Sequence, residues 1–152
     1  MGKDIIKIGN LDFEIRNGQG YSKEYDSENG KLIFEGEYLN GERNGKGKEY
    51  YFDGSLRFEG EYSEGKIWNG KGYDKKDNLQ YEIKNGLGHT KEYNFYGDLI
   101  FVGEYLNGER NGKGEEYGED SFRERKKILR FKGEYLNGKK MEKEKNLISL
   151  RK

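Results

Sequence analysis

The sequence contains no cysteine and no proline, and only one histidine and one tryptophan. The lack of cysteine excludes disulfides, thiolate metal sites and cysteine nucleophiles. Apolar residues make up 31% of the chain, too few for a thick globular core, and none of their runs approaches the length of a membrane-spanning helix. The N-terminus also lacks the apolar segment of a secretory signal. We therefore expect a cytoplasmic protein of flat or elongated shape.

Charge is balanced over the whole chain but not along it. Residues 1–122 carry a net charge of −8, whereas residues 123–152 carry +8. The basic end is either a solvated tail that blunts an open sheet edge or a surface for anionic headgroups. The candidate headgroup patch consists of Arg123, Arg125, Lys126, Lys127, Arg130 and Lys132.

Aromatic residues and glycines are abundant, and they recur in a fixed word. The pattern Phe-x-Gly-Glu-Tyr occurs at 34–38, 58–62, 101–105 and 131–135. The longer word GEYLNGERNGKG occurs without any change at 36–47 and at 103–114. Two shorter units, FEIRNGQG at 13–20 and YEIKNGLG at 81–88, keep only its ends. The leading aromatics recur at intervals in the low twenties for most units, which is typical of stacked supersecondary units.

Each unit has the pattern of a β-hairpin. In the unit at 34–38, Phe34, Gly36 and Tyr38 alternate with two glutamates, so aromatic and acidic side chains occupy opposite faces. The connection LNGERNG is rich in Asn-Gly, a strong hairpin signal. A glycine between two aromatics would leave space for an aromatic ring of a neighbouring strand. The units therefore predict an all-β fold, an elongated single-layer antiparallel meander.

The repeats divide the chain into three parts. Residues 1–12 form an N-terminal capping strand, and residues 139–152 form either a basic tail or a short C-terminal capping helix. Between them, residues 13–138 form about six full or partial repeats. Within the unit at 101–130, the insert GEDSFRERKKILR is either a longer loop or a short helix. The predicted repeats are 13–33, 34–57, 58–80, 81–100, 101–130 and 131–138.

The repeated word resembles the MORN (membrane occupation and recognition nexus) repeat over residues 13–138. The resemblance implies a twisted single-layer sheet with a shallow aromatic groove. The units at Phe13 and Tyr81 depart from the pattern because they lack Gly-Glu-Tyr, so a kink, bulge or narrowing of the sheet is expected there. The candidate groove consists of Phe34, Tyr38, Phe58, Tyr62, Trp68, Phe101, Tyr105, Phe131 and Tyr135.

The same rings have a second interpretation, in which they pack on one another because a one-layer sheet has no second layer to cover them. Trp68 lies outside the usual repeat positions and is either an anchor for a partner or a local packing plug. The two interpretations are compatible, because a one-layer sheet cannot bury every ring.

Catalytic and cofactor signatures are missing from the sequence. His89 has neither a second histidine nor a cysteine to complete a metal site. The NGKG words lack the Lys-Ser/Thr and helix of a phosphate loop and indicate turn glycines. We expect the repeated glutamates Glu37, Glu61, Glu104 and Glu134 to pair with Lys and Arg on the solvent face. The chain is therefore not expected to be an enzyme or to hold a metal or cofactor.

Two functions fit these observations. The first is a non-catalytic scaffold that binds a protein partner, or a second copy of itself, through the aromatic groove and the open sheet ends. The alternative is a peripheral membrane module that binds anionic phospholipid headgroups through the basic C-terminal region. The acidic repeats argue against nucleic acid, and nothing in the sequence indicates a small-molecule substrate.

Overall fold

The structure, a computed structural model, describes residues 4–8, 11–16, 19–119 and 126–142. These residues form strands and no helix, and each strand pairs antiparallel with its neighbours in the chain, except β8 with β9. The strands are β1 (Asp4–Ile8), β2 (Leu11–Arg16), β3 (Gln19–Tyr25), β4 (Leu32–Leu39), β5 (Glu42–Tyr50), β6 (Leu56–Ser63), β7 (Lys66–Tyr73), β8 (Leu79–Ile83), β9 (Gly88–Tyr93), β10 (Leu99–Leu106), β11 (Glu109–Glu119), β12 (Lys127–Leu136) and β13 (Lys139–Lys140). The predicted all-β meander is confirmed.

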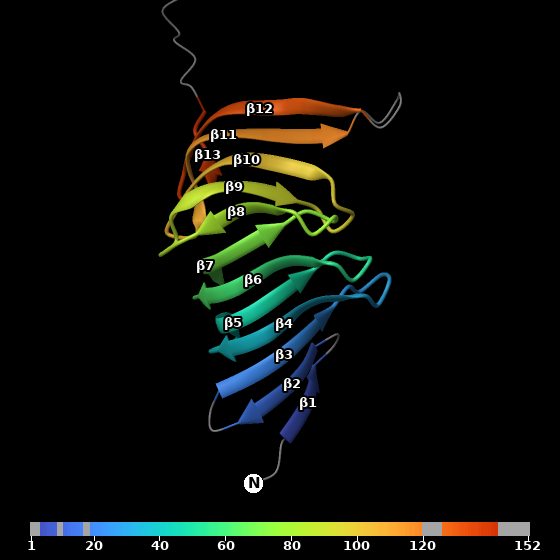
Figure 1. Ribbon diagram of the computed structural model, residues 1–152. Coiled ribbons are helices and arrows are strands. Elements are labelled where there is room, and N and C mark those ends of the chain that lie inside the picture. Colours follow the sequence, from blue (N-terminus) through green and yellow to red (C-terminus); the bar gives the residue numbers. More distant parts are fainter. Residues whose placement is uncertain (1–3, 9–10, 17–18, 120–125, 143–152) are drawn as a thin grey trace, which may run out of the picture.

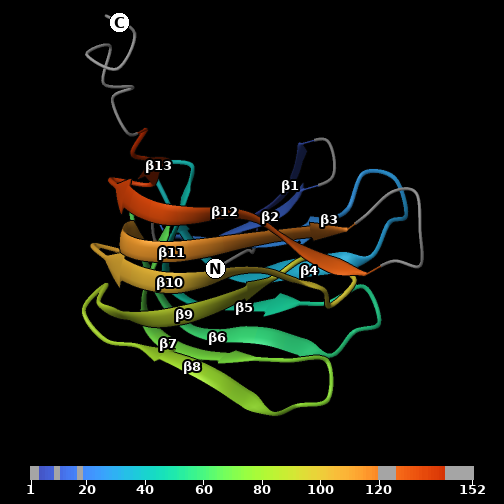
Figure 2. The ribbon, with the colours of Figure 1, turned by 90° about the horizontal axis from the view of Figure 1, so that it is seen from above.

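The strands stack in chain order along one axis (Figure 1). Seen along that axis in Figure 2, the tight hairpin turns lie on one side of the stack and the loops between repeats on the other. We call these the turn side and the loop side. Because each strand contacts mainly its neighbours, stability is built up strand by strand, as in other repeat proteins.

The meander is divided into two sheets, β1 to β8 and β9 to β13. Between them, β8 and β9 share only the isolated bridge from Lys84 to Leu87. The division falls within the short unit at 81–88, where a kink, bulge or narrowing was predicted. Ile83 is fully buried there, and a Cβ on Gly88 would lie 2.9 Å from its Cδ1. The Ile83 side chain thus occupies the space between the diverging strands.

Contacts on both sides of the stack hold the two sheets together. On the loop side, Phe52 N–H donates to the Phe95 carbonyl at 3.0 Å, and their rings stack with centroids 5.2 Å apart. Arg57 donates from Nε and Nη2 to the Tyr93 carbonyl at 3.1 and 2.8 Å. We call these two contacts, Phe52 with Phe95 and Arg57 with Tyr93, the loop clasp. On the turn side, Gly108 N–H donates to the Gly86 carbonyl at 2.9 Å.

The hairpin turns are two-residue turns with positive φ at both positions, the pattern of a type I′ turn. Asn40 and Gly41 have φ values of 52° and 79°, and the less typical pair Glu64 and Gly65 has 50° and 82°. The turn is therefore shorter than the predicted LNGERNG connection, because β5 begins directly at Glu42.

The second Asn-Gly of the repeated word lies inside a strand, which corrects the prediction that the NGKG glycines are turn residues. Gly45 has φ +95° in β5, at a point where the pairing of β4 with β5 shifts register. The Glu37 carboxylate accepts the Lys46 N–H at 2.5 Å across this bulge. Glu104 and Lys113 repeat the contact at 2.7 Å. Glu37 and Glu104 thus hold a backbone bulge, where ion pairs with Lys or Arg were predicted.

The described residues of the insert at 118–130 are mainly strand. The strand β11 extends to Glu119 and β12 begins at Lys127, whereas residues 120–125 lie outside the described residues. The described ends of the insert thus lengthen the hairpin of β11 and β12, and the predicted longer loop or short helix falls mainly on residues 120–125. Residues 139–140 form the short strand β13 against β12, and the rest of the predicted C-terminal helix, 143–152, lies outside the described residues. No helix of a length and apolarity that could cross a membrane occurs in the described part of the chain.

Candidate protein-binding surface

The aromatic rows form the core of the protein. Five of the nine predicted groove rings are at most 4% exposed, and the other four are half-buried. The buried five are Phe34, Phe58, Tyr62, Phe101 and Tyr135. These rings meet edge to face; for example, the centroids of Phe34 and Tyr62 lie 5.4 Å apart at 88°. The rings thus pack on one another, and the five buried ones do not present an open groove to a partner.

Glycines create the space for this packing. A Cβ on Gly47 would lie 2.7 Å from the Phe34 ring and 3.0 Å from the Tyr62 ring. At Gly36 the ring that fills the space is again Phe34, from the same strand. At this position the prediction of a neighbouring strand's ring is therefore wrong; a ring from a neighbouring strand instead fills the space at Gly47, for which no such prediction was made. We call the face that carries these rings the inner face, and the opposite face the outer face.

In both copies of the twelve-residue word, an arginine covers a ring pair on the inner face. The Arg43 guanidinium lies 3.9 Å from the Phe34 ring centroid and donates to both Glu24 oxygens at 2.9 Å. It also donates to Glu49 at 3.0 Å. Glu49 in turn accepts from Arg57 at 2.6 Å and from the Tyr62 hydroxyl at 2.7 Å. This network closes the inner face over the aromatic core.

The second copy of the twelve-residue word builds the same network. Arg110 lies 4.1 Å from the Phe101 centroid and joins Glu92 and Glu116 through contacts of 2.8 Å. Lys140 of β13 provides a further partner for Glu116 at 2.5 Å. The sequence alone does not predict the role of Arg43 and Arg110, because the glutamates that they contact are distant in sequence. Their repetition inside GERNGKG was the available signal.

Burial and these charges shift the pKa of the core groups. Burial first, and then the Glu49 charge, raises the pKa of Tyr62 far above its ordinary value. Burial and Glu92 act on Tyr105 in the same direction. Burial opposes ionisation of Glu116, but its bond with Lys140 and the nearby Arg110 lower its pKa overall. The core therefore holds neutral tyrosines beside ionised carboxylates.

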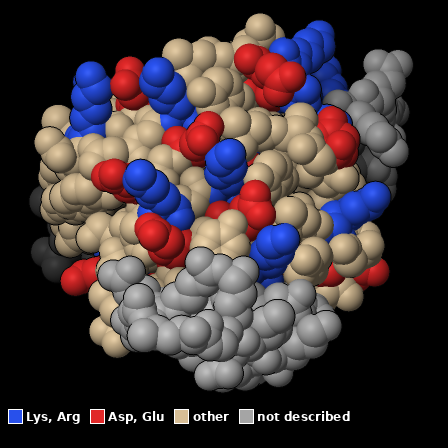
Figure 3. Space-filling view, turned by 60° about the horizontal axis from the view of Figure 1, so that its bottom comes forward, with Lys and Arg blue, Asp and Glu red and all other residues tan. Residues whose placement is uncertain are grey.

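The outer face carries charged side chains in a regular row. Successive cross-strand neighbours alternate in sign across six strands of the first sheet. We call this row the charge ladder; it consists of Lys23, Glu35, Lys48, Glu59, Lys71 and Glu82. In Figure 3, basic and acidic side chains are interspersed over the face that comes forward.

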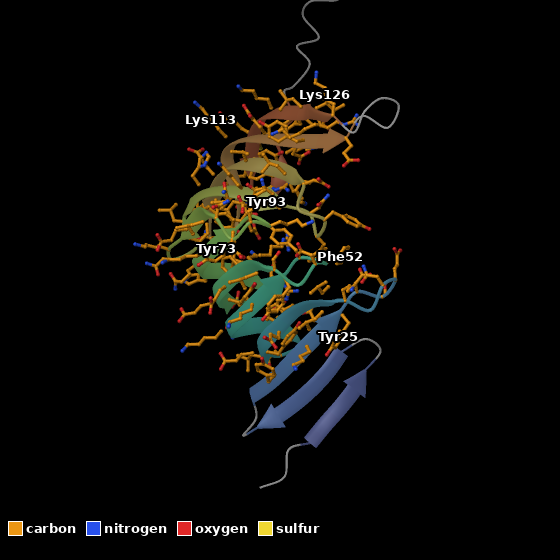
Figure 4. The ribbon with its side chains drawn as sticks, turned by 45° about the vertical axis from the view of Figure 1, so that its right-hand side comes forward. Tyr25, Phe52, Tyr73, Tyr93, Lys113 and Lys126 are labelled. Atoms are coloured by element: carbon orange, nitrogen blue, oxygen red, sulfur yellow. The ribbon has the colours of Figure 1, made fainter. Side chains whose placement is uncertain are left out.

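A row of tyrosines and leucines runs beside the charge ladder toward the loop side. Tyr50 pairs with Leu56, and the same pairing recurs for Tyr73 with Leu79. The Tyr50 hydroxyl donates to Glu35 of the ladder at 2.6 Å, which places this ring on the outer face. In Figure 4, Tyr25, the first tyrosine of the row, lies toward the same side of the stack as Phe52 and Lys126. The outer face therefore has an apolar margin.

The second sheet carries a large open hollow on its outer face. Its volume is about 1360 Å³, and the glycine row of β10, β11 and β12 forms its floor. Charged side chains of both signs border it, among them Lys113, Glu115, Lys132 and Glu134. Val102, in the unit at 101–105, occupies the position that Glu35 occupies in the unit at 34–38. Met141 also lines the hollow, with an apolar side chain that is 48% exposed. The charged strands β11 and β12 lie between these two residues, so the hollow offers two separate apolar side chains among charged ones. A surface that mixes apolar and charged groups in this way is compatible with protein binding.

Comparison with known families decides the nature of the repeats. The MORN repeat model matches residues 34–56 and 101–121, which contain both copies of the twelve-residue word in full. The chain is a MORN-repeat protein. No curated protein sequence matches it significantly.

Within the MORN array, the remaining candidate residues have structural surroundings. The Trp68 ring packs against the turn at Gly86, where a Cβ would lie 2.7 Å from it. This contact favours the packing-plug interpretation. His89 is exposed, on the outer face opposite Glu104. Among the described residues, no group of three or more His, Cys, Asp or Glu side chains could hold a metal ion.

The predicted basic patch does not form one surface in the described part of the MORN array. Lys127 lies over the Tyr117 ring at 4.5 Å, and Lys132 pairs with Glu115 at 3.1 Å, both on the outer face. Arg130 turns to the inner face, where it donates to the Glu119 carbonyl at 2.7 Å and fills the space beside Gly118. Lys126 is exposed, and Arg123 and Arg125 lie outside the described residues.

Proposed function

We propose that this MORN-repeat protein is a non-catalytic scaffold that binds a protein segment in the hollow of its second sheet. The observation that carries the proposal is the open hollow with two apolar side chains, Val102 and Met141, among charged neighbours. The inner face is less suited to binding, because its rings and arginines already bury one another. We therefore propose the outer face, and not the predicted aromatic groove, as the binding surface.

The chemistry of the hollow defines the partner. An extended segment or a helix would place one or two apolar side chains against Val102 and Met141. Its flanking charges would meet Lys113 and Lys132 on the border, or Glu115 and Glu134. Because exposed border charges contribute more to orientation and association rate than to affinity, contacts with the apolar side chains of Val102 and Met141 supply most of the binding free energy.

A selection of displayed peptides on the immobilised chain tests the proposal. Peptides that bind the hollow should lose at least about tenfold in affinity on Val102→Glu, since this change buries a charge against their apolar anchor. The variant should still fold, because Lys91 lies opposite position 102 in β9, and the like charge of Glu115 opposite it in β11 costs at most about 1 kcal/mol. Leu79→Asp, at a residue that is 54% exposed on the first sheet, is the matched control. No enrichment, or equal binding to both variants, would contradict the proposal.

Vesicle co-sedimentation tests the alternative function, binding to an anionic membrane. Exposed Lys126 and Lys127 would contribute to attraction toward anionic headgroups. Co-sedimentation with phosphoinositide-containing vesicles at physiological salt, lost on combined Lys126→Glu and Lys127→Glu, would favour the membrane function. Absence of binding to these vesicles would leave the protein-binding scaffold.

A further inference from the structure

The charge ladder of the first sheet is only partly used within the chain. Its central pair, Lys48 and Glu59, lies 3.6 Å apart with side chains 48% and 51% exposed. Such an exposed pair contributes about 0–1 kcal/mol to stability. Cross-strand pairing therefore explains why neighbouring charges have opposite signs, but it leaves half of each side chain available to another molecule.

The order of the ladder has a symmetry property. It contains six charges in strict alternation, so its reverse order has the opposite sign at every position. If a second copy faces the first across a two-fold axis parallel to the strands and between β5 and β6, each lysine meets a glutamate. Lys48 then faces Glu59 of the other copy, and Lys23 faces Glu82. A two-fold interface requires such a self-complementary surface.

The apolar margin obeys the same symmetry. Rotation about that axis keeps the margin on the loop side and places Tyr50 of one copy against Leu56 of the other. Apolar surface thus meets apolar surface beside the paired charges. Twist of the two sheets limits close contact to the middle of the ladder, which is where these four residues lie. The open hollow of about 510 Å³ over β4, β5 and β6 provides room for the opposing side chains.

We propose that the outer face of the first sheet binds a second copy of this chain, face to face, with Lys48 and Glu59 at the centre. The inference deepens the proposed scaffold function by naming a partner. It uses none of the residues of the second-sheet hollow. Both surfaces can therefore be occupied at once, and a dimer would display two hollows.

A charge-swap experiment tests this arrangement by sedimentation velocity over a concentration series at low salt. The wild-type chain should show a monomer–dimer equilibrium that weakens as salt screens the exposed charges. Lys48→Glu alone, or Glu59→Lys alone, places like charges opposite each other twice per dimer. Each variant should therefore dimerise at least about tenfold more weakly.

Mixing the two variants is the decisive step. In a mixed dimer, each reversed position faces an opposite charge again, so an equimolar mixture should regain wild-type affinity. The intramolecular pair stays broken in both chains, so its loss cannot produce this recovery. Lys76→Glu, in the exposed loop between β7 and β8, should leave association unchanged.

Three results would overturn the inference. They are a wild-type monomer up to about 1 mM, a mixture no stronger than its components, and a dimer insensitive to both reversals. Peptide binding to the hollow is a separate readout, because Val102→Glu should not change dimerisation. Failure of one surface is thus distinguishable from failure of the other.

Discussion

Replacing Arg43 by alanine should destabilise the protein more than replacing any exposed lysine. Arg43 donates two hydrogen bonds to Glu24 and pairs with Glu49. Its guanidinium also packs over the Phe34 ring. Its removal leaves Glu24, 18% exposed, without this bidentate partner, whereas Glu49 keeps Arg57 and Tyr62. Breaking a buried ion pair costs about 3–5 kcal/mol, and the partial exposure of these groups lowers our expectation to about 3 kcal/mol.

Equilibrium unfolding in urea, followed by circular dichroism, measures this loss. Arg43→Lys should lose less, about 1–2 kcal/mol, because it keeps the charge but not the planar fork. Arg110→Ala should lose about as much as Arg43→Ala, because Glu116 keeps Lys140 just as Glu49 keeps Arg57. A loss below about 1 kcal/mol for Arg43→Ala, the level of an exposed pair, would refute the argument that the network closes the core.

Further perturbations test the core, its titration and the junction of the sheets. Gly47→Ala should cost about 1–3 kcal/mol in unfolding free energy, because its Cβ would meet two rings at 2.7–3.0 Å. Gly20→Ala, with nearest atoms at 3.6 Å, should be close to neutral and serves as its control. Because the folded-state pKa of Tyr62 is raised above 10, its contribution to stability is complete below pH 10 and is lost as pH rises beyond it. Tyr62→Phe should reduce that alkaline slope by about 1.4 kcal/mol per pH unit, measured by urea unfolding at several alkaline pH values. Phe52→Ala should weaken the loop clasp and speed hydrogen exchange in β8 and β9, while exchange in β5 stays unchanged.

The repeated units could be predicted from the sequence because their signals are local. Asn40-Gly41 and its equivalents determine the turns, and alternation determines which side chains share a face. The position of Arg43 could not be predicted, because Glu24 and Glu49 approach it only after β3, β4 and β5 have paired. The burial of the candidate groove rings could not be predicted from the sequence for the same reason. Aromatic alternation predicts a shared face, but the burial of Phe34 depends on an arginine and a tyrosine that other strands supply.

The hydrogen bonds between successive turns affect how such an array can lengthen. Gly65 N–H donates to the Arg43 carbonyl, Gly86 to Trp68, Gly108 to Gly86, and Gly138 to Arg110. Each later hairpin therefore carries its own donor toward the hairpin before it and offers an acceptor to the one after it. If a stretch of the coding sequence that encodes one hairpin is duplicated, the new hairpin carries both the N–H donor and the carbonyl acceptor. New units can then be added in one genetic event, without compensating changes at the junction.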